Sequence, residues 1–195
     1  MRNLEAILEL LLRLFGRGSV DVAPINAEEI APGAPGELEP IRDLAPSGQA
    51  LSPHFTLGEF TESDIATRKG ITNAPTPDVL AKLRQTASGM EQVRALLGHP
   101  ITITSAYRSA ALNTAVGGSA KSAHVEGWAV DFKCPAFGSP LEIARAIAAS
   151  EIFQDVDQLI HEYGRWVHIS FDPRKRGQAL TISARGTVQG LHAIA

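Results

Sequence analysis

Two histidines and an aspartate have the types and the spacing of zinc ligands. His124 and Asp131 lie in the segment SAHVEGWAVDF, and His168 follows in the apolar segment WVHIS. A histidine before a glycine turn and an aspartate in the strand after it can converge on one ion. Two histidines and one carboxylate leave a fourth position for water, which is the composition of a catalytic zinc site. The spacing alone fits equally well with a core histidine at 168 and a turn residue at 124.

Several further motifs occur in order around these three residues. They are LSPHFTLGEF at 51–60, TSAYRS at 104–109, LN at 112–113 and VGGS at 116–119. Together with the two histidine segments, they make the chain resemble the zinc D-alanyl-D-alanine carboxypeptidase family, in the branch carried by phages and bacteria. The resemblance covers roughly residues 51–183. It implies an α+β fold shared with Hedgehog-type domains and hydrolysis of D-amino-acid-containing peptides of the cell wall.

The resemblance also implies roles for individual residues. Carried over position by position, His124, Asp131 and His168 match the ligands of a Zn2+ ion. Arg108 matches an arginine beside the metal, where a guanidinium can bind a substrate carboxylate or an oxyanion. Its alternative role is a structural pair with a surface acid. Ser122 matches a residue that lines the substrate site, and its alternative role is a hydroxyl that caps a turn.

The general base is the point at which this sequence departs from the family pattern. Many relatives place an acid three residues before the last zinc histidine, but Arg165 stands there. Glu162 is the nearest upstream acid, and a turn at Gly164 would bring it level with His168. We therefore predict that Glu162 takes a proton from zinc-activated water and returns it to the leaving amine, with Asp157 as the next candidate. The alternative is an exposed Glu162 that pairs with Arg165.

The segments between the motifs predict the elements that must position them. Apolar periodicity and end signals predict helices over 57–60, 76–98, 109–116 and 139–149. Runs rich in β-branched residues predict strands over 101–104, 128–132, 156–162, 166–171 and 179–183. Helices before and between neighbouring strands favour an α+β fold with a largely antiparallel sheet flanked by helices. We expect one zinc peptidase domain over residues 51–195.

The first 50 residues differ in pattern from the remainder. Residues 1–16 predict an amphipathic helix, which is too short and too charged to span a membrane. Residues 17–50 are rich in proline, glycine, alanine and acid, and predict a linker. The helix is interpreted as packing on the domain or on a second copy; the alternative is contact with a partner or with a membrane surface.

Composition restricts the class of partner. With 44% hydrophobic and 20% charged residues, the chain is typical of a soluble globular protein. A net charge of −3 without a basic run excludes nucleic acid as an expected partner. The N-terminus has no convincing signal peptide. We therefore expect synthesis in the cytoplasm, followed by action on the cell wall after release by lysis or as a phage-associated protein.

The resemblance, together with the candidate ligands, implies zinc-dependent hydrolysis of peptide bonds in the stem peptides of peptidoglycan. The enzyme would be a carboxypeptidase if a cationic group holds the free carboxylate, and an endopeptidase if the groove stays open beyond the leaving group. Arg108 fits both. The alternative function is a catalytically inactive module that binds the cell wall or forms part of a virion and keeps the zinc site. Arg165, in the position of the usual acid, motivates that alternative.

Overall fold

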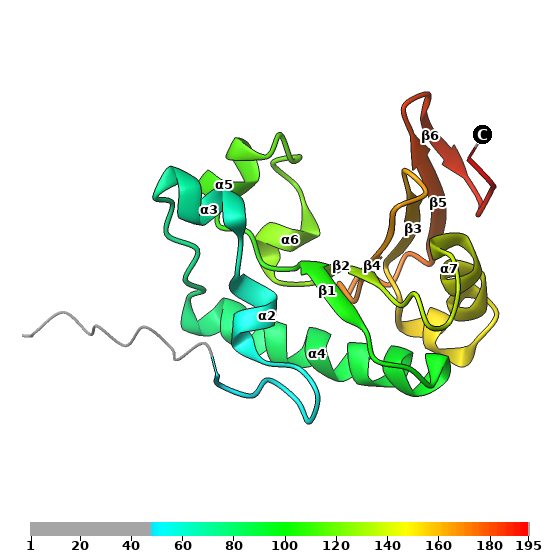
Figure 1. Ribbon diagram of the computed structural model, residues 1–195, viewed down its shortest axis with the longest axis horizontal. Coiled ribbons are helices and arrows are strands. Elements are labelled where there is room, and N and C mark those ends of the chain that lie inside the picture. Colours follow the sequence, from blue (N-terminus) through cyan, green and yellow to red (C-terminus); the bar gives the residue numbers. More distant parts are fainter. Residues whose placement is uncertain (1–47, 195) are drawn as a thin grey trace, which may run out of the picture. The chain divides into compact units, whose positions relative to one another are not determined.

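The described part of the chain is a six-stranded sheet with helices, as the predicted α+β class requires (Figure 1). The computed structural model describes residues 48–194. Its helices are α2 Leu57–Thr61, α3 Asp64–Lys69, α4 Pro77–Leu97, α5 Ala110–Ala115, α6 Ala123–Glu126, α7 Pro140–Ala148 and the 3-10 helix η1 Glu151–Asp155. Its strands are β1 Thr102–Ser105, β2 Ala129–Lys133, β3 Gln158–Glu162, β4 Trp166–Ser170, β5 Gln178–Ser183 and β6 Gly186–Gln189.

The sheet is mostly antiparallel. The strand order is β1-β2-β4-β3-β5-β6, and β3 and β5 form the parallel pair. The connection between β3 and β5 passes through β4 and a loop over residues 171–177. This loop therefore returns to the end of the sheet at which β3 begins, where Gln178 is in register with Gln158.

Helix α4 is the longest element and has clear sequence signals at both ends. The Thr76 side chain accepts a hydrogen bond from the Val79 amide, and Pro77 opens the first turn. Gly98 ends the helix at a φ of 66°, which favours glycine. Along the helix, Gly89 lies against the ring of Phe171, and a Cβ at position 89 would be 2.7 Å from that ring. The glycine thus permits the close approach of α4 to the segment that follows β4.

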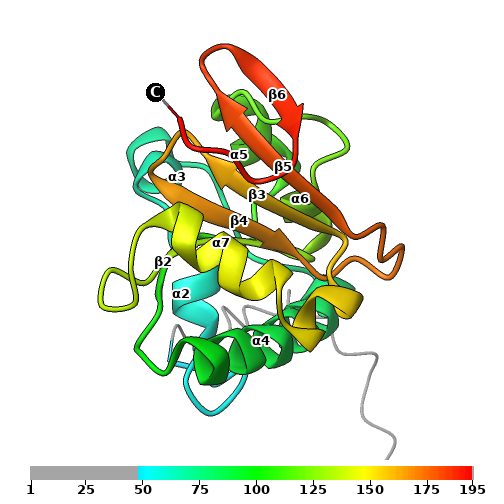
Figure 2. The ribbon, with the colours of Figure 1, turned by 90° about the vertical axis from the view of Figure 1, so that its right-hand side faces the viewer.

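Alternate residues of the central strands form the core. Val130, Phe132, Leu159, Val167 and Ile169 are fully buried in one apolar cluster with residues of α4 and α7. Figure 2 shows α7 lying across β3 and β4 on this face. Because side chains alternate along a strand, the residues between them occupy the opposite face.

The register of the strands determines which residues share that opposite face. Asp131 of β2 is paired with His168 of β4, and His168 is paired with Ile160 of β3. Glu162 is paired with Trp166, and two-residue alternation places both on the same face as His168. The face away from the core therefore carries the candidate metal ligands and the candidate base together.

A tight hairpin turn joins β3 to β4. Tyr163 and Gly164 have φ values of 52° and 67°, and the Arg165 amide donates to the Glu162 carbonyl at 3.0 Å. Two successive residues with positive φ are the signature of a type I′ turn. The turn expected at Gly164 is therefore present, and it includes a tyrosine in the left-handed region as well as the glycine.

The predicted elements are present with small shifts in their ends, but four elements were not predicted. These are α3, α6, η1 and β6. The folded region also begins before Leu51, since the Leu57 amide donates to the Gln49 carbonyl at 2.7 Å and Ala50 is bridged to Thr56. The predicted helix over 1–16 and nearly all of the predicted linker over 17–50 lie outside the described residues. Within 48–194, no helix is long and apolar enough to cross a bilayer.

Candidate active site

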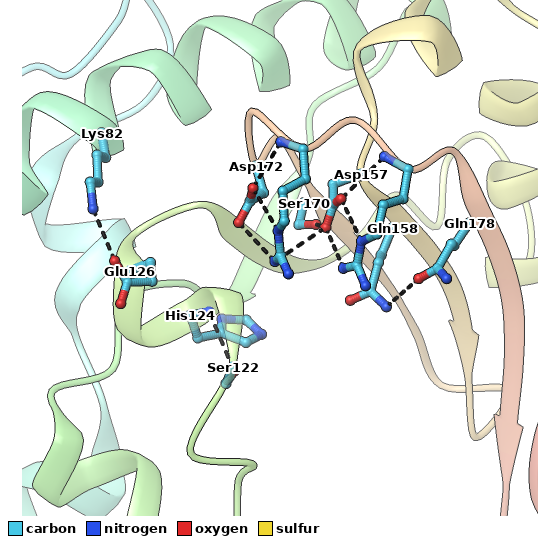
Figure 3. Close-up of polar contacts among 11 residues, drawn as sticks. Lys82, Ser122, His124, Glu126, Asp157, Gln158, Ser170, Asp172 and Gln178 are labelled. Atoms are coloured by element: carbon cyan, nitrogen blue, oxygen red, sulfur yellow. Dashed lines mark hydrogen bonds and ion pairs between the residues drawn. The ribbon is translucent and has the colours of Figure 1, made fainter.

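His124 lies on the one-turn helix α6 rather than in the loop expected from the sequence. The Ser122 hydroxyl caps this helix by accepting a hydrogen bond from the His124 amide at 3.3 Å (Figure 3). Gly127 ends the helix at a φ of 81°, and the chain then enters β2. Ser122 therefore fills the capping role and also lines the cleft described below. Its predicted contact with substrate stays a prediction.

The orientation of the His124 ring is fixed by a backbone carbonyl. Its Nδ1 lies 2.6 Å from the carbonyl oxygen of Ala106. Because a carbonyl can only accept, the hydrogen of the neutral ring must lie on Nδ1. The lone pair of Nε2 then faces Asp131 and His168. A hydrogen bond from the second ring nitrogen is the usual support of a histidine that binds metal.

Three ligand atoms converge at this point with the spacing of a zinc site. His124 Nε2 is 3.2 Å from both Asp131 Oδ1 and His168 Nδ1, and those two atoms are 2.8 Å apart. Tetrahedral zinc with bonds of about 2.0–2.1 Å would separate its ligand atoms by about 3.3 Å. All three side chains are buried. The donor set and its spacing therefore fit the metal predicted from the sequence.

Electrostatics favour the protonation states that a metal requires. Burial lowers the pKa of His124 despite the attraction of Asp131, which favours the neutral imidazole. Burial alone would raise the pKa of Asp131, but interactions with His124 and His168 outweigh it and hold that pKa far below its usual value. A neutral imidazole and an ionised carboxylate are the forms that bind zinc.

Arg108 supports the aspartate from the other side. Its Nη2 donates to Asp131 Oδ2 at 2.6 Å, and its Nε donates to the Ser105 hydroxyl at 2.9 Å. The partner of Arg108 is thus a buried candidate ligand and not a surface acid. Arg108 also lines the cleft, and a guanidinium carries five N–H donors, so further donors remain for a substrate oxygen.

Glu162 is close enough to Asp131 and His168 to be affected by their charges. It is half-buried, lines the same cleft, and accepts a hydrogen bond from Trp166 Nε1 at 3.1 Å. Burial raises the pKa of Glu162, the charge of Asp131 raises it further, and His168, Trp166 and Arg108 oppose the rise. A carboxylate with a raised pKa in a cleft is suited to exchanging protons. Its assignment as the base stays a prediction.

The other candidates for the base are engaged elsewhere. The side chain of Asp157 is 0% exposed and accepts two hydrogen bonds from the guanidinium of Arg176, at 2.8 and 2.6 Å. His161 alternates with Glu162 and Ile160 along β3, so it lies on the opposite face, where its Nδ1 is 2.9 Å from the carbonyl oxygen of His192. The geometry therefore favours Glu162 over both.

The ligands lie in an open cleft of about 1260 Å3. One part of its lining comes from α3 and from the loop between α5 and α6, and another from β3, β4 and the loop before β5. Figure 1 shows α3, α5 and α6 grouped apart from β3, β5 and β6, with the short central strands between them. The cleft passes over the candidate metal site and continues toward Arg174 and Arg176.

Several residues of the site had no role in the sequence-based prediction. Ser105 and Trp166 belong to the recognised motifs but were given no function, and each now has a direct hydrogen bond to Arg108 or Glu162. The Ala106 carbonyl gives no signal in a sequence, since every residue has one. Arg174 and Arg176 follow the last histidine motif. Two arginines separated by one residue in a polar loop were the sequence signal that could have indicated a role for them.

Comparison with known proteins agrees with the geometry of the site. A family model described as Peptidase M15 matches residues 53–170, which include all three candidate ligands and Glu162. The chain belongs to the Peptidase M15 family. No curated protein sequence matches it. Peptidase M15 proteins are zinc metallopeptidases, so membership supports peptidase activity and zinc as the metal of the His124, Asp131 and His168 cluster.

Proposed function

We propose that this M15 peptidase hydrolyses peptide bonds in the stem peptides of peptidoglycan. The observation that carries the proposal is the placement of Glu162 in the same cleft as His124, Asp131 and His168, and on the same sheet face as the last two. A metal site and a carboxylate of raised pKa in one open cleft are what a water-dependent peptidase needs.

Each residue has a defined task in the proposed reaction. Zinc held by His124, Asp131 and His168 would supply a Lewis acid, which lowers the pKa of water and polarises a carbonyl. Glu162 accepts the proton of the attacking water and transfers it to the leaving amine. Arg108 holds Asp131 through one N–H and offers others to the oxyanion or to a substrate carboxylate.

The form of the cleft supports an extended peptide as the substrate. Its volume of about 1260 Å3 exceeds the roughly 300–1,000 Å3 typical of sites for small molecules. The cleft is open to solvent, and its lining includes polar groups of α3 and of the loop between β4 and β5 as well as the candidate metal ligands. A short stem peptide of alternating D and L residues is compatible with such a groove.

The alternative function, an inactive wall-binding or virion module, is less well supported. The argument for it was Arg165 in the position of the usual acid, but Glu162 supplies a carboxylate in the cleft. We further propose that the protein reaches the wall after lysis or as a phage-associated protein. We also propose that residues 1–16, for which the sequence predicts a helix, contact a partner or a membrane surface.

A digest of purified muropeptides tests the function. Full-length protein loaded with zinc is incubated with the muropeptides, and the products are measured by mass spectrometry. Loss of one alanine from the end of a stem would identify a carboxypeptidase, and separation of a stem or a cross-link would identify an endopeptidase. Glu162→Gln serves as the inactive control. Muropeptide masses that stay unchanged with the zinc-loaded protein would refute the proposal.

A further inference from the structure

Two arginines line the cleft beyond the metal site and have no part in the proposed reaction. Arg174 and Arg176 belong to the loop between β4 and β5, and both contribute to the cleft that holds His168. Their side chains are 54% and 36% exposed, so their guanidinium groups remain accessible. Lys175 between them has a φ of 45° and pairs with Asp155 instead.

Both guanidinium groups are held in place by carboxylates at their inner side. Asp172 accepts hydrogen bonds from Arg174 Nε at 2.9 Å and from Arg174 Nη2 at 2.8 Å. Asp157 accepts hydrogen bonds from Arg176 Nε at 2.8 Å and from Arg176 Nη2 at 2.6 Å. Arg174 Nη2 also lies 3.6 Å from Asp157 Oδ2, and Figure 3 shows these contacts meeting at Asp157. A guanidinium bound through two hydrogen bonds has already lost most of its rotational freedom, so little more is lost when it binds a ligand.

The supporting acids do not themselves face the cleft. Asp157 is fully buried, the side chain of Asp172 is 13% exposed, and neither contributes to the lining. The lining at this end consists of the two guanidinium groups together with Gln158, whose amide donates to Gln178 at 3.0 Å. A ligand in this part of the cleft therefore meets cationic and amide groups, which suit a carboxylate.

Strand β4 relates the two arginines to the candidate metal site. Ser170 lies two residues beyond His168 on the same strand face, about 6.6 Å along the strand. Its hydroxyl donates to Asp157 at 3.5 Å, which links this point of the strand to the arginines. An extended peptide that crosses the metal site along β4 would therefore bring a group about two residues away to the level of Ser170, beside the acid that both arginines contact.

We infer that Arg174 and Arg176 form a subsite for a carboxylate that the bound peptide carries about two residues from the bond to be cut. This inference rests on the proposed function, because it treats the ligand as a peptide in the M15 cleft. Stem peptides have a suitable group: the free α-carboxylate of the isoglutamyl residue lies two residues before the first D-alanine. The subsite would favour stems with that carboxylate over stems in which it is an amide.

Two synthetic stem pentapeptides test the subsite. They differ in one group, since the isoglutamyl residue carries a free α-carboxylate in one and a carboxamide in the other. Both kcat/KM and the dissociation constant are measured with zinc-loaded full-length protein, the latter for the Glu162→Gln variant by calorimetry. Wild type should favour the carboxylate peptide by about tenfold, the scale of one charge-assisted hydrogen bond at a partly exposed site.

Arg174→Ala is the informative variant, because Arg176 also supports the buried Asp157. It should remove most of the preference between the two peptides, and Arg174→Gln provides the same test if the alanine variant folds poorly. Arg185→Ala, in the turn between β5 and β6, makes the same change in charge outside the cleft lining and should keep the preference. Thermal unfolding of each variant checks that the fold is retained.

The outcomes separate this inference from the proposed function. Cleavage of both peptides at equal rates by wild type, or a preference that Arg174→Ala leaves intact, would overturn the subsite while the peptidase function stands. A carboxylate preference in binding without cleavage would support the subsite and refute the hydrolase. Neither binding nor cleavage of either peptide would overturn both.

Discussion

His124 and His168 approach to 3.2 Å between Nε2 and Nδ1, although they come from a one-turn helix and a strand that are 44 residues apart in the sequence. The Ala106 carbonyl accepts from His124 Nδ1, so the lone pair of His124 Nε2 faces His168 Nδ1 and Asp131 Oδ1. A cation bound by His168, Asp131 and His124 would use that lone pair. The metal-binding predictions follow from this pair.

Zinc content should depend on each of the three ligands. We expect one zinc per chain in the purified protein and well under one in His124→Ala, because two remaining ligands bind zinc far more weakly than three. Elemental analysis by mass spectrometry measures both. His99→Ala is the matched control, since His99 is exposed at the end of α4 and outside the cluster. Equal zinc in the two variants would contradict the assignment.

Arg108 should affect both metal binding and turnover. Its hydrogen bond to Asp131 supports a ligand, so Arg108→Ala should weaken zinc binding by about 10-fold or more. Loss of a donor to the oxyanion should also reduce kcat by roughly 100-fold at saturating zinc. Arg108→Lys should recover only part of each, since lysine lacks the planar pair of donors. Normal kcat in zinc-saturated Arg108→Ala would leave Arg108 a purely structural role.

The sequence was sufficient for the elements that carry local signals, and it named the three residues that the structure brings together as a candidate metal site. Helix α4 has a cap, a first-turn proline and a terminal glycine, and all three signals proved correct. The ligand set followed from ordered motifs. Helix α6 was missed because four residues are too few to show helical periodicity.

Other features depend on tertiary contacts that no local pattern reports. The parallel pairing of β3 with β5 is one, because antiparallel pairing was the simpler expectation for neighbouring strands. The Arg176 and Asp157 pair is another: it joins residues 19 positions apart and turned a candidate base into a buried structural acid. Such roles depend on the contacts that a side chain makes in the folded protein.

Residues 48–195 should fold and cleave without the preceding segment. The structure supports this because the main apolar cluster of the described residues begins at Leu51, and the earliest backbone bond described there uses Gln49. A protein that starts at Gly48 should have the same zinc content and a similar kcat/KM to the full chain. An insoluble or inactive product would mean that residues 1–47 pack on the domain.

Ionised Asp157 should increase the free energy of unfolding at pH values above its unfolded pKa, and this increase should be lost in acid. Burial alone would raise the pKa of Asp157, but hydrogen bonds and charge from Arg176, with a further contribution from Arg174, hold it below the usual value. A lowered folded pKa means that the contribution is present above an unfolded pKa of about 3.9 and disappears as the pH falls through the folded pKa.

Asp157→Asn should therefore destabilise the protein at pH 7 and reduce the slope of stability against pH below about pH 4. The expected loss is about 2 kcal/mol, less than for a fully buried pair because Arg176 stays partly in water. Urea unfolding at several pH values measures it. Asp155→Asn, which breaks the exposed pair with Lys175, is the control and should change little. Equal effects of the two variants would contradict the role of burial.

Glu162 should be required for turnover and not for binding the metal. Glu162→Gln keeps the size of the side chain and its hydrogen bond from Trp166, but an amide cannot accept the proton of water. Loss of a general base costs about 100- to 10,000-fold in rate, so kcat should fall by that range while zinc content and thermal stability stay near wild type.

Glu151→Gln, a substitution at an exposed residue of η1, is the control for Glu162→Gln and should have normal kcat. Trp166→Phe removes the hydrogen bond to the carboxylate while keeping an aromatic ring in the cleft lining, and should lower kcat by a few-fold to about tenfold. An active Glu162→Gln beside an inactive, zinc-replete Asp157→Asn that still folds would transfer the role to Asp157, against the burial of that side chain. If both variants cleave normally, the proton of the attacking water goes to another acceptor and the proposed role of Glu162 is wrong.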